Sequence, residues 1–222
     1  MVDESSAGLV AIVFAGGEPP HQAIRDRLPA PEVVIAADSG LDHARAWGLH
    51  VDVVVGDLDS VDPVGLDAAT SDGTAVELHP ANKDETDLEL AIVSAIAHGA
   101  QHVIVVGGYG GRLDHFLANL ELLASPRFRE LRVEAWVGGA HVTVAHERAE
   151  LRGPPQSLCS LLALGGVAHG VTTEGLRYAL HDDDLFPGST RGVSNELIAP
   201  VATVSLRTGV LLAIQPHALE ER

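Results

Sequence analysis

The chain has 222 residues, 46% of them hydrophobic and 20% charged, so it can bury a core as one large domain or two modest ones. Its formal net charge of −17 argues against nucleic acid and membranes as partners, since nucleic acid and anionic lipid carry the same sign of charge. The start lacks the basic and apolar segments of a signal peptide, and no apolar run approaches the roughly 18 residues of a membrane span. With one cysteine, which suits a reducing compartment, we expect a cytoplasmic protein.

The first half of the chain contains five short segments rich in valine and isoleucine, and each predicts a buried strand. They are residues 9–14, 32–37, 52–55, 75–78 and 102–106. Apolar residues at helical spacing predict a helix over residues 88–96 and another over residues 113–120. Strands that alternate with helices predict an open, mostly parallel α/β sheet.

The pattern changes after about residue 130. Segments 131–137 and 141–145 still predict strands, and helical periodicity then ends. Further β-like segments are separated by Gly and Pro: 157–164, 167–172, 176–180, 197–206 and 210–215. We therefore expect an α/β domain over residues 1–146 and a smaller C-terminal antiparallel β domain over residues 147–222.

Polar residues gather directly after all five predicted strands of the first half. In chain order they are Gly17, Asp38, Asp57 with Asp59, residues 82–87 and residues 107–115. In open α/β sheets ligands bind outside the carboxyl ends of the strands. The five strand ends are therefore one candidate site.

Asp57 and Asp59 flank a single residue after a buried strand. Extended side chains at positions i and i+2 point to the same side, so both carboxylates can reach one cation. Magnesium prefers a few carboxylates, completed by water and phosphate oxygens. The alternative is an Asp-rich turn in which Asp59 or Ser60 caps a following helix, and the pair alone favours neither interpretation.

Thr86 and Glu89 match a capping box at the start of the helix predicted near residue 88. A capped helix end would fix Asp84 and Asp87, which could then join the carboxylates after the third strand. Several converging carboxylates need cations nearby. Mg²⁺ and Lys83, the only lysine in the chain, are the candidates.

A glycine-rich loop, residues 107–111, leads into the second predicted helix, so its backbone N–H groups could face phosphate oxygens. Arg112 at the entrance of this helix is the candidate phosphate clamp. Arg112, His115 and Asn119 follow at i, i+3 and i+7, which is also typical of an ordinary solvated face. In the β domain, composition predicts a hairpin turn at residues 192–196 and an exposed acidic loop at residues 181–184, more readily than a metal site.

Seven short segments, in this order, resemble the motifs of the thiamine pyrophosphokinase (thiamine diphosphokinase) family. They are residues 37–40, 56–60, 83–87, 111–115, 160–164, 170–176 and 192–196. The resemblance implies an N-terminal α/β domain, a C-terminal β-sandwich and a homodimer with active sites at the subunit interface. It implies an Mg²⁺-dependent transfer of diphosphate from ATP to the hydroxyl group of thiamine, giving thiamine diphosphate and AMP.

The resemblance also implies roles for individual residues. Asp57, Asp59 and Asp87 would hold the metal, and Asp87 or Asp84 could accept the hydroxyl proton. The residues expected around the nucleotide and its phosphates are Gly17, Asp38, Lys83, Thr86 and Arg112, and those expected near thiamine, on the partner subunit, are Ser194 and Asn195. Aromatic side chains commonly stack on thiamine rings, and after Trp136 the chain offers Tyr178 and Phe186.

Three other activities stay open at this point. The first is a diphosphokinase acting on another hydroxymethyl heterocycle such as a pterin, which also releases AMP. The second is a nucleotide-sugar transferase that uses the Asp57 and Asp59 pair and releases a nucleoside diphosphate. The third is a non-catalytic sensor of thiamine or a nucleotide, which would have no metal-dependent turnover.

Overall fold

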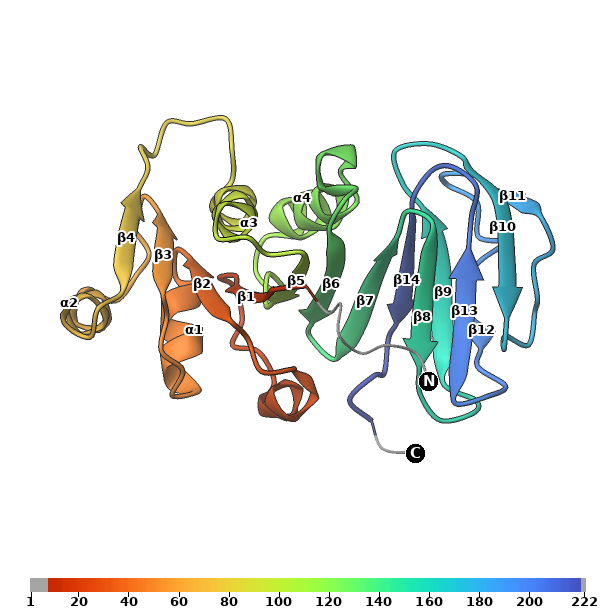
Figure 1. Ribbon diagram of the computed structural model, residues 1–222, viewed down its shortest axis with the longest axis horizontal. Helices are drawn as coiled ribbons and strands as arrows, with labels where there is room; N and C mark the ends of the chain where they lie inside the picture. Colours follow the sequence, from red (N-terminus) through yellow and green to blue (C-terminus); the bar gives the residue numbers. More distant parts are fainter. Residues whose placement is uncertain (1–7, 221–222) are drawn as a thin grey trace. The chain divides into compact units, whose positions relative to one another are not determined.

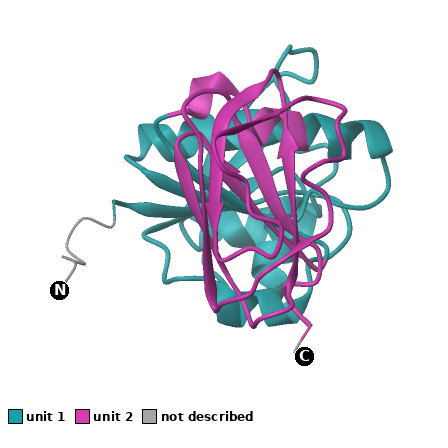
Figure 2. Ribbon diagram, turned by 90° about the vertical axis from the view of Figure 1, so that its right-hand side faces the viewer, with its two compact units in different colours: residues 1–119, 130–138 teal, residues 120–129, 139–222 magenta. Residues whose placement is uncertain are grey.

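A computed structural model describes residues 8–220 of the chain. The chain divides into two compact units, coloured separately in Figure 2. Unit 1 is residues 1–119 and 130–138, and unit 2 is residues 120–129 and 139–222. Among the residues that the structure describes, no helix combines the length and the apolar character needed to cross a membrane.

Unit 1 contains a sheet of parallel strands in the order β6-β5-β1-β2-β3-β4 (Figure 1). The strands are β1 Val10–Phe14, β2 Val33–Ala37, β3 Val53–Gly56, β4 Ala75–Leu78, β5 His102–Val106 and β6 Arg132–Val137. Every residue of β1, β2 and β3 is buried, which explains their continuous apolar sequences. The chain runs outward from β1 to β4 and then returns to the other side of β1, so the strand order reverses between β1 and β5.

The helices of unit 1 include the two predicted ones and two that the sequence did not reveal. They are α1 Gly40–Ala46, α2 Pro63–Ser71, α3 Asp87–Ala97 and α4 Leu113–Leu123, which continues into unit 2, and a 3₁₀ helix spans Gln22–Arg27. Helix α1 has seven residues and α2 buries Ala69 alone, so neither carries a long apolar stripe. The N-cap of α2 is Asp62, which accepts from two backbone N–H groups, so the alternative interpretation of Asp59 or Ser60 as the helix cap is wrong.

Unit 2 consists mainly of antiparallel strands, after a 3₁₀ helix at Pro126–Phe128. The strands are β7 Ala140–Ala145, β8 Arg148–Arg152, β9 Leu158–Ala163, β10 Ala168–Glu174, β11 Asp183–Leu185, β12 Asn195–Glu196, β13 Val201–Ser205 and β14 Leu211–Gln215. They pair in the orders β12-β9-β14-β7 and β11-β10-β13-β8. In β8, β9 and β13 buried residues alternate with more exposed ones, and the buried ones join a single core. The expected antiparallel β-sandwich is confirmed.

Most predicted strands are confirmed to within a few residues, but 176–180 is not a strand. Its residues form bends after Gly175, which has φ of +76°, and an isolated bridge at Leu176. Strands β8, β11 and β12 were not predicted from the sequence. Strand β8 reads Arg-Ala-Glu-Leu-Arg, and its strict polar and apolar alternation could have revealed it.

Candidate active site

A cavity of about 820 Å³ in unit 1 is lined by the loops that follow β1, β2, β3 and β5 and by the segment that leads into α3. It lies at the carboxyl ends of these parallel strands, where ligands of open α/β sheets bind. All the site residues predicted in the α/β domain line it: Gly17, Asp38, Asp57, Asp59, Lys83, Asp84, Thr86, Asp87 and Arg112. His115 and Asn119 line it too, so this side of α4 is more than an ordinary solvated face.

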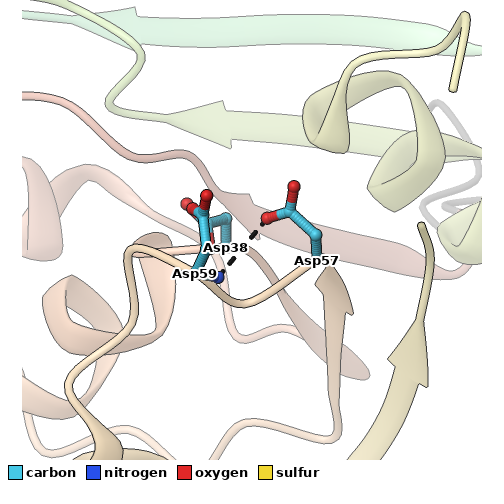
Figure 3. A group of neighbouring side chains, drawn as sticks. All are labelled: Asp38, Asp57 and Asp59. Carbon is cyan, nitrogen blue, oxygen red and sulfur yellow. Dashed lines mark hydrogen bonds between the residues drawn. The ribbon is translucent and has the colours of Figure 1, made fainter. Parts of the chain in front are cut away.

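Three carboxylates lie close enough together in this cavity to hold a metal ion (Figure 3). Asp38, Asp57 and Asp59 each offer an oxygen atom within 4.8 Å of the others. Few internal donors serve them: the Asp59 N–H lies 3.4 Å from Asp57 Oδ1, and the Ser60 hydroxyl donates to Asp59 at 2.8 Å. Asp38 Oδ1 is buried without a hydrogen-bond partner among the described residues. The group is therefore short of positive charge and donors.

The pKa of Asp38 reflects its position in this cluster. Burial raises the pKa of Asp38 above its usual value and outweighs the lowering by the Ser39 backbone N–H, while the charges of Asp87, Asp57 and Asp59 each raise it by a smaller amount. The backbone of Asp38 also has φ of +47°, a conformation that non-glycine residues seldom adopt. Both features indicate a side chain held in place for a ligand at some cost in stability.

Lys83 brings a positive charge into the same cavity. Its Nζ lies 2.9 Å from Asp87 Oδ1 and 4.0 Å from Asp57 Oδ2, and its side chain is only 11% exposed. Desolvation lowers the pKa of Lys83, but the hydrogen bond and charge of Asp87, with the charges of Asp57 and Asp38, outweigh this and raise it. Lys83 is therefore a firmly charged ammonium group, and Asp87 is the carboxylate that it neutralises.

The predicted capping box positions Asp87. The Thr86 hydroxyl accepts a hydrogen bond from the Glu89 N–H at 3.2 Å, and α3 begins at Asp87. This confirms Thr86 as the N-cap. Because Asp87 is the first residue of a capped helix, its direction into the cavity is fixed.

The loops after β1 and β5 pack backbone against backbone at the point where the strand order reverses. The Gly108 N–H donates to the Gly16 carbonyl at 2.9 Å. A Cβ on Gly17 would lie 2.4 Å from the Tyr109 carbonyl oxygen, and one on Gly107 would lie 2.7 Å from the Ala15 carbonyl oxygen, both at positive φ. These glycines are therefore required for the loops to meet, whatever they contribute to phosphate binding.

Two side chains behind these loops support them. His43 Nδ1 lies 3.2 Å from the Ala15 carbonyl oxygen, and the Asn119 amide donates to the Gly108 carbonyl at 3.4 Å. His43 lies on the unpredicted helix α1 and was not among the predicted site residues. No spacing or motif in the sequence distinguishes it from the other histidines.

Arg112 lies at the mouth of the cavity and is paired with a neighbour. Its Nη2 and Nε lie 2.6 and 3.2 Å from the two carboxylate oxygens of Asp114, and both side chains are about two thirds exposed, at 69% and 65%. The Arg112 guanidinium lowers the pKa of Asp114 to about 2. Arg112 can act on a phosphate only if it leaves or shares this carboxylate.

Ser194 and Asn195 lie in unit 2, where Ser194 directly precedes β12 and Asn195 is its first residue. Ser194 is exposed, with φ of +59°, while Asn195 is buried. Their predicted role near thiamine stays a prediction.

The acidic run at residues 181–184 lies elsewhere in unit 2. It is not simply an exposed loop, because Asp183 and Asp184 begin the edge strand β11. Each carboxylate has a basic partner: Asp182 pairs with Arg207, Asp183 with Arg191 and Asp184 with His169.

Two family models match this chain, one in each half of the sequence. A model described as thiamin pyrophosphokinase, catalytic domain, matches residues 25–135, and one described as thiamin pyrophosphokinase, vitamin B1 binding domain, matches residues 145–211. A thiamine pyrophosphokinase of Bacillus subtilis is 28% identical over 183 residues, which are 82% of this chain and 86% of that protein. Thiamine pyrophosphokinase 1 of rice is 27% identical over 179 residues, 74% of this chain and 65% of the rice protein.

Solved structures of thiamine pyrophosphokinases are similar to this chain over nearly its whole length. The crystal structure of the Bacillus subtilis protein has a TM-score of 0.81 at 25% identity and covers 93% of this chain and 98% of that one. The thiamin pyrophosphokinase of Geobacillus thermodenitrificans has a TM-score of 0.78 at 28% identity, with 93% and 96% covered. The Candida albicans protein, at 13% identity and a TM-score of 0.75 over 93% of this chain and 88% of that one, shows a shared fold.

Proposed function

Because the chain belongs to the thiamine pyrophosphokinase family, we propose that it transfers the diphosphate group of ATP to the hydroxyl group of thiamine, giving thiamine diphosphate and AMP. The observation that carries this proposal is the cavity of unit 1, where clustered carboxylates and a single ammonium group meet glycine-rich loops at strand ends. A second match, to a vitamin B1 binding domain, disfavours a pterin as the acceptor.

The residues of the cavity fit Mg²⁺. Three carboxylate oxygens within 4.8 Å of one another suit a hard cation, and Asp38 Oδ1 has no hydrogen-bond partner among the described residues. We assign Asp57 and Asp59 as ligands. The third is Asp38 by proximity or Asp87 by family resemblance. When bound, the ion would neutralise charge on the phosphate oxygens.

The chain's own residues would then orient the reactants. Lys83, already between Asp57 and Asp87, can take up phosphate charge inside the cavity, and Arg112 can do so at its mouth. Gly17 lets the β1 loop lie against the β5 loop, and Thr86 fixes the start of α3. Phosphoryl-type transfer needs mainly this positioning and charge neutralisation for attack of the hydroxyl oxygen on the β-phosphorus.

The hydroxyl proton needs an acceptor as the new bond forms. Asp87 is engaged by Lys83 at 2.9 Å, and a carboxylate held by an ammonium group is a weak base. Asp84 lines the cavity and is exposed, so it is the better candidate of the two. Transfer of the proton to water is the alternative that an active Asp84→Asn variant would support.

We assign ATP and Mg²⁺ chemistry to residues 1–146 and thiamine recognition to residues 147–222, with Ser194 and Asn195 near the acceptor. We also propose a homodimer with active sites at the subunit interface, on the strength of the family resemblance and of the prevalence of two-fold symmetric oligomers. A cytoplasmic location fits the single buried cysteine. Sedimentation giving an active species near the chain's own 23.2 kDa would contradict the dimer.

Incubation of the purified protein with ATP, Mg²⁺ and thiamine, followed by mass analysis of both products, tests the proposal. We expect AMP and thiamine diphosphate in equal amounts, and no AMP when a pterin alcohol replaces thiamine. Release of ADP, or AMP formation that does not depend on thiamine, would overturn it. Absence of metal-dependent turnover would favour the sensor.

A further inference from the structure

The turn that carries Asp57 and Asp59, between β3 and α2, is not extended. Leu58 lies between the two aspartates and has φ of +61°, in the left-handed region that non-glycine residues seldom adopt. Strand β3 ends at Gly56, and the Asp59 N–H lies 3.4 Å from Asp57 Oδ1, so the chain folds back on itself at once (Figure 3). The two carboxylates therefore meet through a reversal of the backbone at Leu58, and not through the extended spacing expected from the sequence.

The start of this turn is packed closely against the rest of the acidic cluster. Gly56 has φ of +147°, and a Cβ at this position would lie 3.0 Å from Asp87 Oδ1 and 3.4 Å from the Asp38 Cβ. The Asp38 N–H donates to the Val55 carbonyl at 2.9 Å, which ties the loop after β2 to β3. The backbone that leads into Leu58 therefore has little room to move toward Asp38 or Asp87.

The end of the turn is anchored as well. The Asp62 N–H donates to Oδ2 of Asp42, on helix α1, at 3.3 Å, and the Asp62 carboxylate caps α2. Between these points the Ser60 hydroxyl donates to the Asp59 carboxylate at 2.8 Å. A costly backbone conformation persists only where its surroundings fix it. The turn meets this condition, because it is held on both sides of Leu58.

The conformation of Leu58 decides where the Asp59 carboxylate lies. Asp38, Asp57 and Asp59 offer oxygen atoms within 4.8 Å of one another, and Asp59 is the member that follows the reversal. A change of φ at Leu58 to the common value of about −60° would rotate the following residues by about 120° and take Asp59 away from the group. We propose that Leu58 is a positioning residue, whose left-handed backbone places the Asp59 carboxylate beside those of Asp57 and Asp38. This inference rests on the proposed function, because it needs a cation at this cluster.

Two substitutions of Leu58 separate a backbone role from a packing role. Isoleucine is an isomer of leucine, but its β-branch disfavours positive φ, whereas glycine adopts positive φ readily. If the backbone conformation matters, Leu58→Ile weakens Mg²⁺ binding and Leu58→Gly preserves it. If the half-buried side chain matters through packing, the order is reversed, because Leu58→Gly removes the side chain and Leu58→Ile keeps its volume.

Calorimetric titration of Mg²⁺, with a non-hydrolysable ATP analogue present, measures this order. We expect Leu58→Ile to raise the Mg²⁺ dissociation constant roughly tenfold, because the binding-competent turn is then populated only in part, and Leu58→Gly to stay within about threefold of the wild type. Leu78→Ile is the matched control, since Leu78 is 71% exposed in β4 and does not have positive φ. Unchanged affinity in Leu58→Ile, or weaker binding by Leu58→Gly than by Leu58→Ile, would overturn the proposal.

The Mg²⁺ dependence of the rate gives a second readout. All the carboxylates are still present in Leu58→Ile, so the Mg²⁺ concentration for half-maximal rate should rise by a similar factor, and kcat at saturating Mg²⁺ should recover to within about twofold of the wild type. A kcat that stays low at saturating Mg²⁺ would contradict a role limited to the position of Asp59.

The titration also separates this inference from the proposed function. Weaker Mg²⁺ binding by Leu58→Ile than by Leu58→Gly supports the positioning role even if the wild type forms no thiamine diphosphate. Absence of Mg²⁺ binding in the wild type rejects the positioning role, and product analysis of the wild type judges the proposed function separately.

Discussion

The aspartate cluster of the unit 1 cavity and the acidic run of unit 2 differ in their partners. In unit 2, Asp182, Asp183 and Asp184 each have a basic partner, and the pKa values of Asp183 and Asp184 are lowered, chiefly by the His181 N–H for Asp183 and by His169 for Asp184. In unit 1, Asp38 lies among other carboxylates and its pKa is raised, first by burial. Paired aspartates stabilise the folded state, whereas clustered carboxylates destabilise it unless a cation binds them. Acidic residues alone therefore do not mark a site.

The largest effect should come from removing a proposed metal ligand. Asp57→Asn or Asp59→Asn is expected to lower kcat by at least about 10²-fold and to leave the fold intact, because a lost ligand removes several kcal/mol of transition-state stabilisation. Asp183→Asn, which removes a paired aspartate of unit 2, is the matched control and should keep near-normal turnover. Near-normal rates for both unit 1 variants at saturating Mg²⁺ would remove these residues from the metal site.

A smaller effect is expected at Lys83. A guanidinium is larger and planar and cannot take the place of a compact ammonium between Asp57 and Asp87. Lys83→Arg should therefore raise the ATP KM or lower kcat by roughly tenfold, about 1.4 kcal/mol. ATP should also protect this only lysine from amine-reactive labelling. Full activity of the variant, together with labelling that ATP does not affect, would return Lys83 to a structural role.

The sequence alone predicts this difference between the units only in part. Strand ends, the Thr86 cap and the acidic motifs are local patterns in the sequence. They were enough to predict site residues of unit 1 that line the cavity. What the sequence could not supply was pairing over long separations, such as Asp184 with His169 or Tyr178 with Asn195. Such pairs depend on the register of distant strands, which composition and periodicity do not encode. For the same reason the residues at 176–180 were taken for a strand.

The cost of gathered charge should be visible in stability. Because the folded-state pKa of Asp38 is raised, its charge destabilises the fold above that pKa, and the penalty is removed as pH falls through it. Asp38→Asn should therefore raise the Tm of the metal-free protein at pH 7, by about 2 °C since solvent screens part of the repulsion. The difference from the wild type should shrink in acid. Thermal unfolding without Mg²⁺ measures this, and a lower Tm for the variant would contradict it.

The smallest effect is expected at Asp184, with the opposite sign. Its folded-state pKa is lowered, so its contribution to stability is present above the ordinary aspartate pKa and is lost as pH falls through the folded value. Asp184→Asn should lower the Tm slightly at pH 7, and the variant and the wild type should converge in acid. Added Mg²⁺ should not change this difference, whereas it should reverse the advantage of Asp38→Asn. If Mg²⁺ changed the Tm difference of both variants, the proposed difference between the two acidic groups would be contradicted.

Calorimetric titration of Mg²⁺ into the protein, with a non-hydrolysable ATP analogue present, tests most directly whether the gathered carboxylates of unit 1 await a cation. We expect the wild type and Asp183→Asn to bind with the same affinity and Asp57→Asn and Asp59→Asn to lose most of the binding heat. Equal binding by all four proteins would contradict the account, because the ion would then not depend on the carboxylates that lie closest together in the cavity.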